Sequence, residues 1–79
     1  MNSGKALLIL PRDNVAVALE DLSAGSSILN GCVSSAAIPQ GHKIALYDIG
    51  RGEQIVKYGC VIGHATQDMP RGALVLVEN

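Results

Sequence analysis

The sequence predicts an all-β domain made of short strands, and three observations support that fold class. Its apolar residues fall in brief runs rich in Val, Ile, Leu and Ala, and each run is bounded by Gly, Pro, Asp or Asn. No window keeps a helical period over several turns. A pattern centred on Gly recurs four times along the chain.

The expected strands follow one another with turn residues between them. They span Leu7–Leu10, Val15–Leu19, Lys43–Leu46, Gln54–Tyr58, Val61–Ala65 and Ala73–Val77. Pro11–Asn14 has the composition of a turn between the first two strands, and Gly59 breaks the chain between the fourth and the fifth. A brief helix is the alternative for Ser34–Ile38.

Each copy of the repeated pattern has an apolar residue, two spacers, Gly, two spacers, and Ile or Val. The copies are Leu22–Gly25–Ile28, Ile38–Gly41–Ile44, Ile49–Gly52–Ile55 and Met69–Gly72–Val75. Three of them are directly preceded by Asp (Asp21, Asp48 and Asp68), and the other by Ala37. Because Asp is a favoured helix N-cap and Gly ends tight turns, we expect each Asp and Gly to frame a single helical turn between strands.

Length and charge narrow the function. A chain of 79 residues makes a single domain, residues 1–79, with a small core. Its six Lys and Arg residues are scattered, and seven acidic residues leave a formal net charge of −1. Nucleic-acid binding needs a basic stripe or exposed aromatic rings, so we expect no nucleic-acid partner. The near-neutral composition favours association with another polypeptide.

The remaining composition indicates a cytoplasmic protein with no membrane partner. The apolar run Ala6–Leu10 is too short for a signal-peptide core or a membrane span. Cys32 and Cys60 lie far apart without metal-ligand spacing. We expect two free thiols in a reducing cytoplasm, with a single disulfide as the alternative.

His42 and Lys43 are the candidate site residues. They follow Gly41 and precede a strand, so a ligand can reach them at the mouth of that strand. Histidine exchanges a proton near neutral pH, and the lysine charge suits a carboxylate. Spacing alone favours a structural histidine at a strand edge over a functional one. His64 follows Gly63 without a neighbouring cation and is expected to be structural.

The other polar residues are also expected to be structural. The aspartates occupy equivalent positions of a repeated turn, which favours capping over acid–base catalysis. Tyr58 is expected to fill the core with its hydroxyl at the rim. A pocket lined by Tyr58 and Lys57 is the alternative.

Two segments carry a resemblance to a known family. They are Pro39-x-Gly41-His42-Lys43-Ile44-Ala45-Leu46-x-Asp48-Ile49 and Gly52-Glu53-x-Ile55-x-Lys57-Tyr58-Gly59-x-x-Ile62-Gly63-x-Ala65-Thr66-x-Asp68. Together with Pro11–Leu19, they resemble the N-terminal domain of the altronate and galactarate dehydratases over nearly the whole chain. In that family the unit is a SAF domain with a β-clip fold. It is also similar to a separately encoded small subunit of altronate dehydratase-like and sulfolactate sulfo-lyase-like enzymes.

The resemblance implies a lyase that removes water, or sulfite in the sulfo-lyase case, from a polyhydroxy or sulfonated acid. His42 and Lys43 match the family's Gly-His-Lys motif, so the resemblance implies that they are catalytic. It also implies a divalent metal, iron or manganese, held mainly by a larger catalytic subunit or domain rather than by this chain alone. The substrate is then a sugar acid, and the chain is expected to be inactive without its partner.

The C-terminal end departs from the family pattern. Family members commonly end this domain with His-x-His-Asn, whereas this chain ends Leu76-Val77-Glu78-Asn79. Glu78 can replace a histidine as an oxygen ligand and is the candidate metal ligand, but Leu76 cannot coordinate a metal. A non-catalytic SAF module that binds sugar acids or regulates is therefore the alternative function. A structural homo-oligomer is a third.

Overall fold

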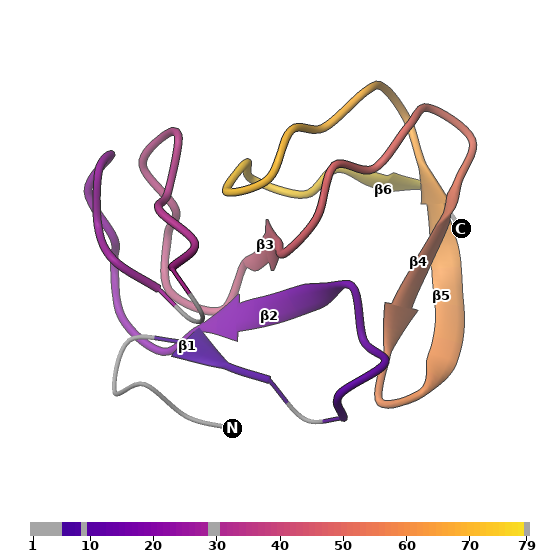
Figure 1. Cartoon of the computed structure of the whole chain (residues 1–79), viewed down its shortest axis with the longest axis horizontal. Helices are drawn as coiled ribbons and strands as arrows, with labels where there is room; N and C mark the ends of the chain where they lie inside the picture. The colour runs from indigo at the N-terminus through magenta and orange to yellow at the C-terminus, as the bar shows by residue number, and fades with distance from the viewer. Residues whose placement is uncertain (1–5, 9, 29–30, 79) are drawn as a thin grey trace.

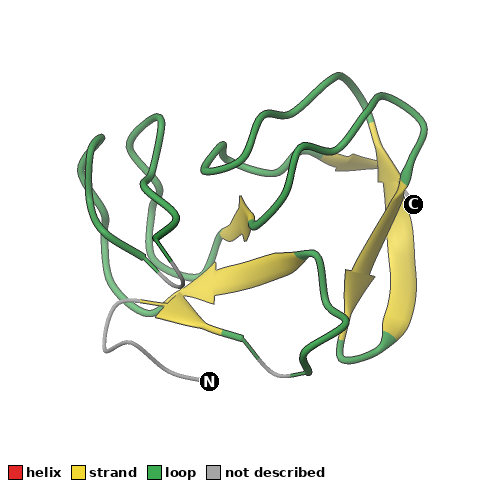
Figure 2. Ribbon diagram, viewed as in Figure 1, coloured by secondary structure: helices red, strands yellow, loops and turns green. Residues whose placement is uncertain are grey.

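The computed structural model describes residues 6–8, 10–28 and 31–78, with only the backbone described for residues 77 and 78. Within these ranges the chain forms six strands and no helix (Figure 2). The strands are β1 (Ala6–Leu7), β2 (Val15–Ala18), β3 (Lys43–Ala45), β4 (Gln54–Lys57), β5 (Cys60–Ala65) and β6 (Val77–Glu78). The all-β prediction is confirmed. No helix in the described part of the chain is long and apolar enough to cross a bilayer.

The first five strands lie where the sequence predicts them, with ends that differ by a few residues. β1 is shorter than the predicted Leu7–Leu10, in which residue 9 lies outside the described residues. The sixth strand begins later than predicted, because Leu74 makes only an isolated bridge to Ile44 and continuous pairing starts at Val77. The alternative helix over Ser34–Ile38 is not formed.

The strands form two antiparallel sheets, β1-β2-β3 and β4-β5-β6 (Figure 1). Successive side chains of a strand point to opposite faces, so β2 can serve two cores. Ala16 and Ala18 lie in one apolar cluster, whereas Val15 lies in the other. The central strand of the first sheet therefore lies between two small cores and contributes side chains to both.

The repeated turns are β-turns and not the single helical turns that we expected. In one copy the N–H of His42 donates to the carbonyl of Pro39 at 3.1 Å, with Gly41 at a φ of 85°. A positive φ at the third residue of a four-residue turn is the mark of a type II turn, and only Gly adopts it without strain. The other three repeat glycines also have positive φ: Gly25, Gly52 and Gly72. The left-handed glycine reverses the chain before a helical turn can form.

The four copies pair two by two. Leu22 and Ile38 exchange both backbone hydrogen bonds at 2.8 Å, and Ile49 and Met69 do the same at 2.8 and 2.7 Å. We call residues 18–25 with 34–41 the first loop pair, and residues 45–52 with 65–72 the second loop pair. Each pair has an approximate two-fold relationship, because its two copies exchange matching backbone hydrogen bonds.

The capping aspartates act across these pairs and not within their own turns. Asp48 accepts the N–H of Arg71 at 2.9 Å, and Asp68 accepts the N–H of Arg51 at 2.8 Å, so the second loop pair is capped reciprocally. In the first loop pair Asp21 accepts the N–H of Gln40 at 2.8 Å. The capping role is confirmed, but each carboxylate caps the partner copy.

A small residue completes the repeat three positions before the Asp position. Its carbonyl accepts the N–H of the glycine in the partner copy, as in Gly41 to Ala18 at 2.9 Å and Gly72 to Ala45 at 2.7 Å. The same contact joins Gly52 to Ala65 at 2.9 Å and Gly25 to Ser34 at 2.8 Å. The full unit is therefore small-x-x-Asp-apolar-x-x-Gly, with Ala37 in place of Asp in one copy. The small residue, the Asp and the apolar residue bond to a second copy, whereas the turn hydrogen bond stays within its own copy.

Each loop pair packs on its own apolar cluster. Leu22 and Ile38 are buried in one cluster, and Ile49 and Met69 are buried in the other. The two loop pairs touch where the carbonyl of Gly72 accepts the N–H of Ser35 at 2.9 Å. The result is a rigid frame of paired turns around two aliphatic cores.

Candidate functional site

His42 occupies the last position of the type II turn that begins at Pro39, and its side chain is exposed. Its carbonyl accepts the N–H of Ala18 at 2.9 Å, which fixes the backbone from which the imidazole projects. Among the described residues the imidazole has no hydrogen-bond or ion-pair partner. The described fold therefore does not use this side chain, which can meet a proton donor or acceptor from another molecule.

Lys43 follows directly as the first residue of β3 and is half-buried. It pairs with Val17 of β2, and its carbonyl accepts the N–H of Val75 at 2.9 Å. Both neighbours hold its backbone, so His42 and Lys43 leave a rigid turn at consecutive positions. A proton-transfer group and a cation suited to a carboxylate thus lie at one strand mouth. Their catalytic role remains a prediction.

His64 and Glu78 lie in the other sheet and not beside His42. They face each other in register on β5 and β6. His64 is exposed, and the side chain of Glu78 lies outside the described residues, so its predicted role as a metal ligand is not placed by the structure. Within the described ranges, no three His, Cys, Asp or Glu side chains gather closely enough to hold a metal ion. The two cysteines are free thiols, Cys32 buried and Cys60 exposed.

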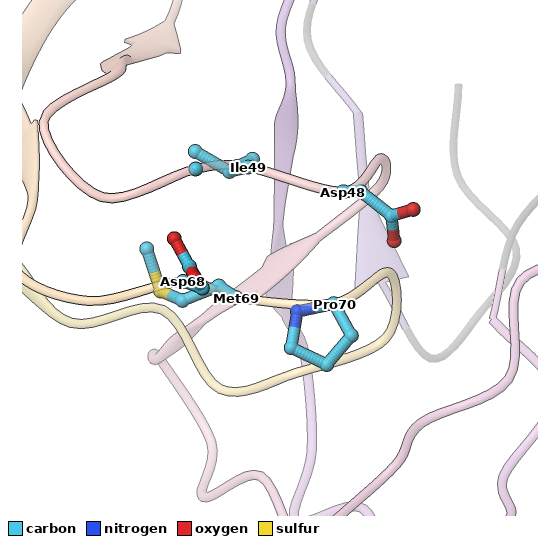
Figure 3. Close-up of a pocket in the computed structure, with 6 residues that line it drawn as sticks. Asp48, Ile49, Asp68, Met69 and Pro70 are labelled. Carbon is cyan, nitrogen blue, oxygen red and sulfur yellow. The ribbon is translucent and has the colours of Figure 1, made fainter.

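A pocket of about 310 Å³ lies on the second loop pair, lined by Asp48, Ile49, Gly50, Asp68, Met69 and Pro70. Figure 3 shows the carboxylates of Asp48 and Asp68 at opposite ends of the paired segments. Each carboxylate already accepts a backbone N–H of the partner copy. They do not converge on one point as the two carboxylates of an acid–base pair must, so this pocket follows from turn pairing.

The sequence-based interpretation missed the role of Asp13, whose residue is only 1% exposed. Its carboxylate accepts the backbone N–H groups of Gly59 at 2.8 Å, Tyr58 at 2.9 Å and Leu10 at 3.2 Å. Burial alone would raise the pKa of Asp13, but the three N–H donors and the nearby Arg12 guanidinium outweigh it, so the pKa is lowered. Asp13 is thus an ionised carboxylate that ties the β1–β2 turn to the β4–β5 hairpin.

Asn14 extends the same connection along β4. Its side-chain oxygen accepts the N–H of Val56 at 2.8 Å, and its amide nitrogen donates to the carbonyl of Gln54 at 2.9 Å. The backbone N–H of Asn14 also donates to Val56 at 3.2 Å. Neighbouring polar side chains in the turn between β1 and β2 therefore fix the second sheet against the first.

Tyr58 is not the core residue that we expected, because it is 52% exposed at the tip of the β4–β5 hairpin. Tyr58 and Gly59 form the two-residue loop of this hairpin, with φ of 56° and 71°. Positive φ at both central residues is characteristic of a type I′ turn. The ring carries the ammonium group of Lys57 4.8 Å from its centroid. The Asp13 carboxylate holds the turn that points the ring outward, which the local sequence does not reveal.

The small β module presents the exposed His42 directly before the half-buried Lys43, and comparison with known proteins gives its family. The family model for the altronate/galactarate dehydratase SAF domain matches residues 4–79. The chain belongs to this family. The SAF domain identity agrees with the all-β fold of short strands described above.

Several relatives of this SAF domain are enzymes or enzyme subunits. It is 45% identical over 65 residues to galactarate dehydratase (L-threo-forming) of Escherichia coli K12, covering 80% of this chain and 12% of the relative. It is 44% identical over 70 residues to altronate dehydratase of the same organism, covering 85% and 14%. It is 42% identical over 43 residues to (2R)-sulfolactate sulfo-lyase subunit alpha of Chromohalobacter salexigens, covering 54% and 46%. The SAF domain thus corresponds to a small part of the two dehydratases and to about half of the sulfo-lyase subunit.

Proposed function

We propose that this SAF domain is the small subunit or N-terminal domain of a cytoplasmic sugar-acid dehydratase, where it helps a larger catalytic part to form the substrate site. Its relatives include altronate and galactarate dehydratases, and it spans only 12–14% of the two Escherichia coli enzymes. Most of such an enzyme is therefore supplied by other residues. The reaction class is the elimination of water from a polyhydroxy acid.

The observation that carries this proposal is the exposed, unpartnered imidazole of His42 directly before Lys43, at a turn that the fold holds rigidly from both sides. Elimination next to a carboxylate needs a group that moves a proton and a cation that holds the carboxylate. His42 supplies the first and Lys43 the second. Because the backbone is fixed, both groups are presented without a large entropic cost.

We place the divalent metal, iron or manganese, in the larger catalytic part. Glu78 stays the candidate metal ligand from this chain, and no step is routed through the metal. The residues for which we propose a catalytic role are His42 and Lys43.

The test compares His42→Ala with His64→Ala in the assembled enzyme, since both histidines are exposed, and His42 precedes β3 whereas His64 lies in β5 of the other sheet. We expect His42→Ala to lower kcat for altronate or galactarate by about 100-fold or more, with an unchanged melting temperature. His64→Ala should keep wild-type kcat. Lys43→Met should raise KM, because the substrate carboxylate loses its cation.

Full activity of His42→Ala would contradict the catalytic role. Calorimetric titration of sugar acids into residues 1–79 alone distinguishes the alternative function, a non-catalytic binding module, from the catalytic one. Binding without the larger part, together with no effect of this chain on dehydration when the larger part is present, would show a non-catalytic sugar-acid-binding module.

A further inference from the structure

The tip of the β4–β5 hairpin carries a surface that the proposed chemistry does not use. We define the Tyr58 surface as Arg12, Lys57 and Tyr58. In Figure 1 the turn between β4 and β5 lies at the edge of the molecule, beside the loop that follows β1. Arg12 comes from that loop, and a Cβ added to Gly59 would lie 2.5 Å from its guanidinium. The ammonium group of Lys57 lies over the Tyr58 ring, 4.8 Å from its centroid, so the two cations and the ring gather around the same turn.

The backbone of this surface is strained. Tyr58 has a φ of 56°, a left-handed conformation that bulky residues rarely adopt, and among the described residues it is the only non-glycine with positive φ. Such strain persists only where the surroundings enforce it, and it gathers at functional positions. Here the buried Asp13 carboxylate enforces it by accepting the N–H groups of both turn residues. An Asn at this position would satisfy the same turn without strain.

The side chains of the surface have the composition of an interface centre. Tyr58 is 52% exposed, and it is one of only two tyrosines in a chain without Phe or Trp. Tyr and Arg are enriched among the residues that dominate binding energy in protein interfaces. A ring already held outward by a fixed turn loses little conformational freedom on binding.

The charge of the surface identifies the kind of partner. Lys57 and Arg12 are both cationic, and within residues 10–13 and 56–62 the only carboxylate is the buried Asp13. Asp13 offsets one of the two positive charges, so these segments keep a net positive charge. A complementary surface therefore carries carboxylates around an apolar pocket in which the ring can pack.

We propose that the Tyr58 surface docks this module onto its larger catalytic part, in an acidic pocket that takes the Tyr58 ring. The inference rests on the proposed function, which requires a larger part. It adds the place of contact and the chemistry of the opposing surface. His42 directly precedes β3 of the first sheet, and Tyr58 lies at the tip of the β4–β5 hairpin of the second sheet, so docking and chemistry use separate residues.

The first test substitutes Tyr58→Asn, which removes the ring and keeps a residue that tolerates the left-handed turn. After a cooperative unfolding transition of residues 1–79 has been recorded, the variant is titrated into the purified larger catalytic polypeptide by calorimetry. We expect a Kd about 30-fold or more above that of the wild type, together with a higher melting temperature. A purely structural role for the ring cannot give both results. Tyr47→Asn is the matched control, because Tyr47 is 59% exposed and lies outside the Tyr58 surface.

The second test removes the charges with Arg12→Gln and Lys57→Gln. The wild-type Kd should rise with salt, and the double variant should lose most of that dependence. Arg51→Gln is the control, since Arg51 is an exposed cation of the second loop pair.

The outcomes separate the two proposals. If the wild-type chain binds the larger part and the Tyr58 and charge variants bind it equally well, the docking surface is wrong and the proposed function stands. If the wild-type chain does not bind the larger part at all, both proposals are overturned.

Discussion

The carboxylate of Asp13 accepts the backbone N–H of Tyr58 at 2.9 Å, across 45 positions of sequence. The same side chain accepts the N–H of Gly59 and of Leu10, so one buried carboxylate closes two turns that belong to different sheets. A carboxylate has lone pairs for all three donors, and the nearby Arg12 adds a favourable charge. The two sheets are thus joined here by polar, long-range contacts, although the cores are aliphatic.

We predict that Asp13→Asn lowers the free energy of unfolding by about 3 kcal/mol. The substitution leaves one acceptor oxygen for three donors and turns an amide nitrogen toward them. Urea denaturation of the chain measures the loss. Asp21→Asn is the control, because the exposed Asp21 accepts a single N–H and its substitution should cost no more than about 1 kcal/mol. Equal losses in both variants would contradict this account.

The lowered pKa of Asp13 also predicts a pH dependence. A carboxyl whose folded-state pKa lies below its unfolded value of about 3.9 contributes stability above that value. This contribution is lost as the pH falls through the folded-state pKa. The free energy of unfolding should therefore fall with decreasing pH below about 4, and Asp13→Asn should lack that component. Urea midpoints measured for both proteins on either side of this pH check the prediction. Parallel curves would show that Asp13 does not titrate in this way.

Ala37 marks a missing cap that can be restored. In the second loop pair each copy has an Asp that accepts a backbone N–H of the other copy. In the first loop pair only Asp21 does so, and Ala37 occupies the position from which a second Asp would accept the N–H of Ala24. Ala37→Asp should supply a carboxylate to the N–H of Ala24 and raise the free energy of unfolding by about 0.5–1 kcal/mol. Ala36→Asp, one position away on an equally exposed residue, should bring no such gain. A melting temperature that is unchanged by Ala37→Asp would show that the two loop pairs are not equivalent.

Two glycines at equivalent turn positions should respond differently to substitution by Ala. Gly41 and Gly72 have φ of 85° and 90°, so both substitutions carry the strain of a left-handed residue, about 1 kcal/mol. A Cβ at Gly41 meets open space, whereas one at Gly72 would overlap the backbone carbonyl of Val33. We expect Gly41→Ala to lower the free energy of unfolding by about 1 kcal/mol and Gly72→Ala by about 3 kcal/mol or more. Chemical denaturation distinguishes them, and equal losses would mean that the loop pairs do not pack as described.

The repeated turns were predictable from the sequence to the extent that local chemistry decides them. Gly at a fixed distance after an apolar residue identified the reversals, and all four glycines are left-handed. The sequence did not indicate that Asp48 caps the turn of Arg71, 23 positions away. Spacing within one copy indicates which residue can cap a turn. Which turn that residue caps depends on which copies pair in space.

The candidate site was predictable in part for the same reason. The position of His42 after a turn glycine placed it at the end of a turn before β3. The exposure of Tyr58 was not predictable, because Tyr-Gly lacks the Asn-Gly signal of a type I′ turn. Its conformation is held by Asp13, a residue 45 positions earlier that the sequence presents as part of an ordinary turn.

The pairing of turns also bears on when the module can fold during its synthesis. A growing chain emerges from the ribosome N-terminus first. The turn of Gly52 has no partner until Ala65 and Asp68 have emerged, and Asp48 waits for Arg71. The second core therefore cannot close on a nascent chain until nearly the whole module has been translated. Where a SAF domain precedes a catalytic region on one polypeptide, the ribosome is therefore about to translate that region, or has begun to, by the time the second core can close.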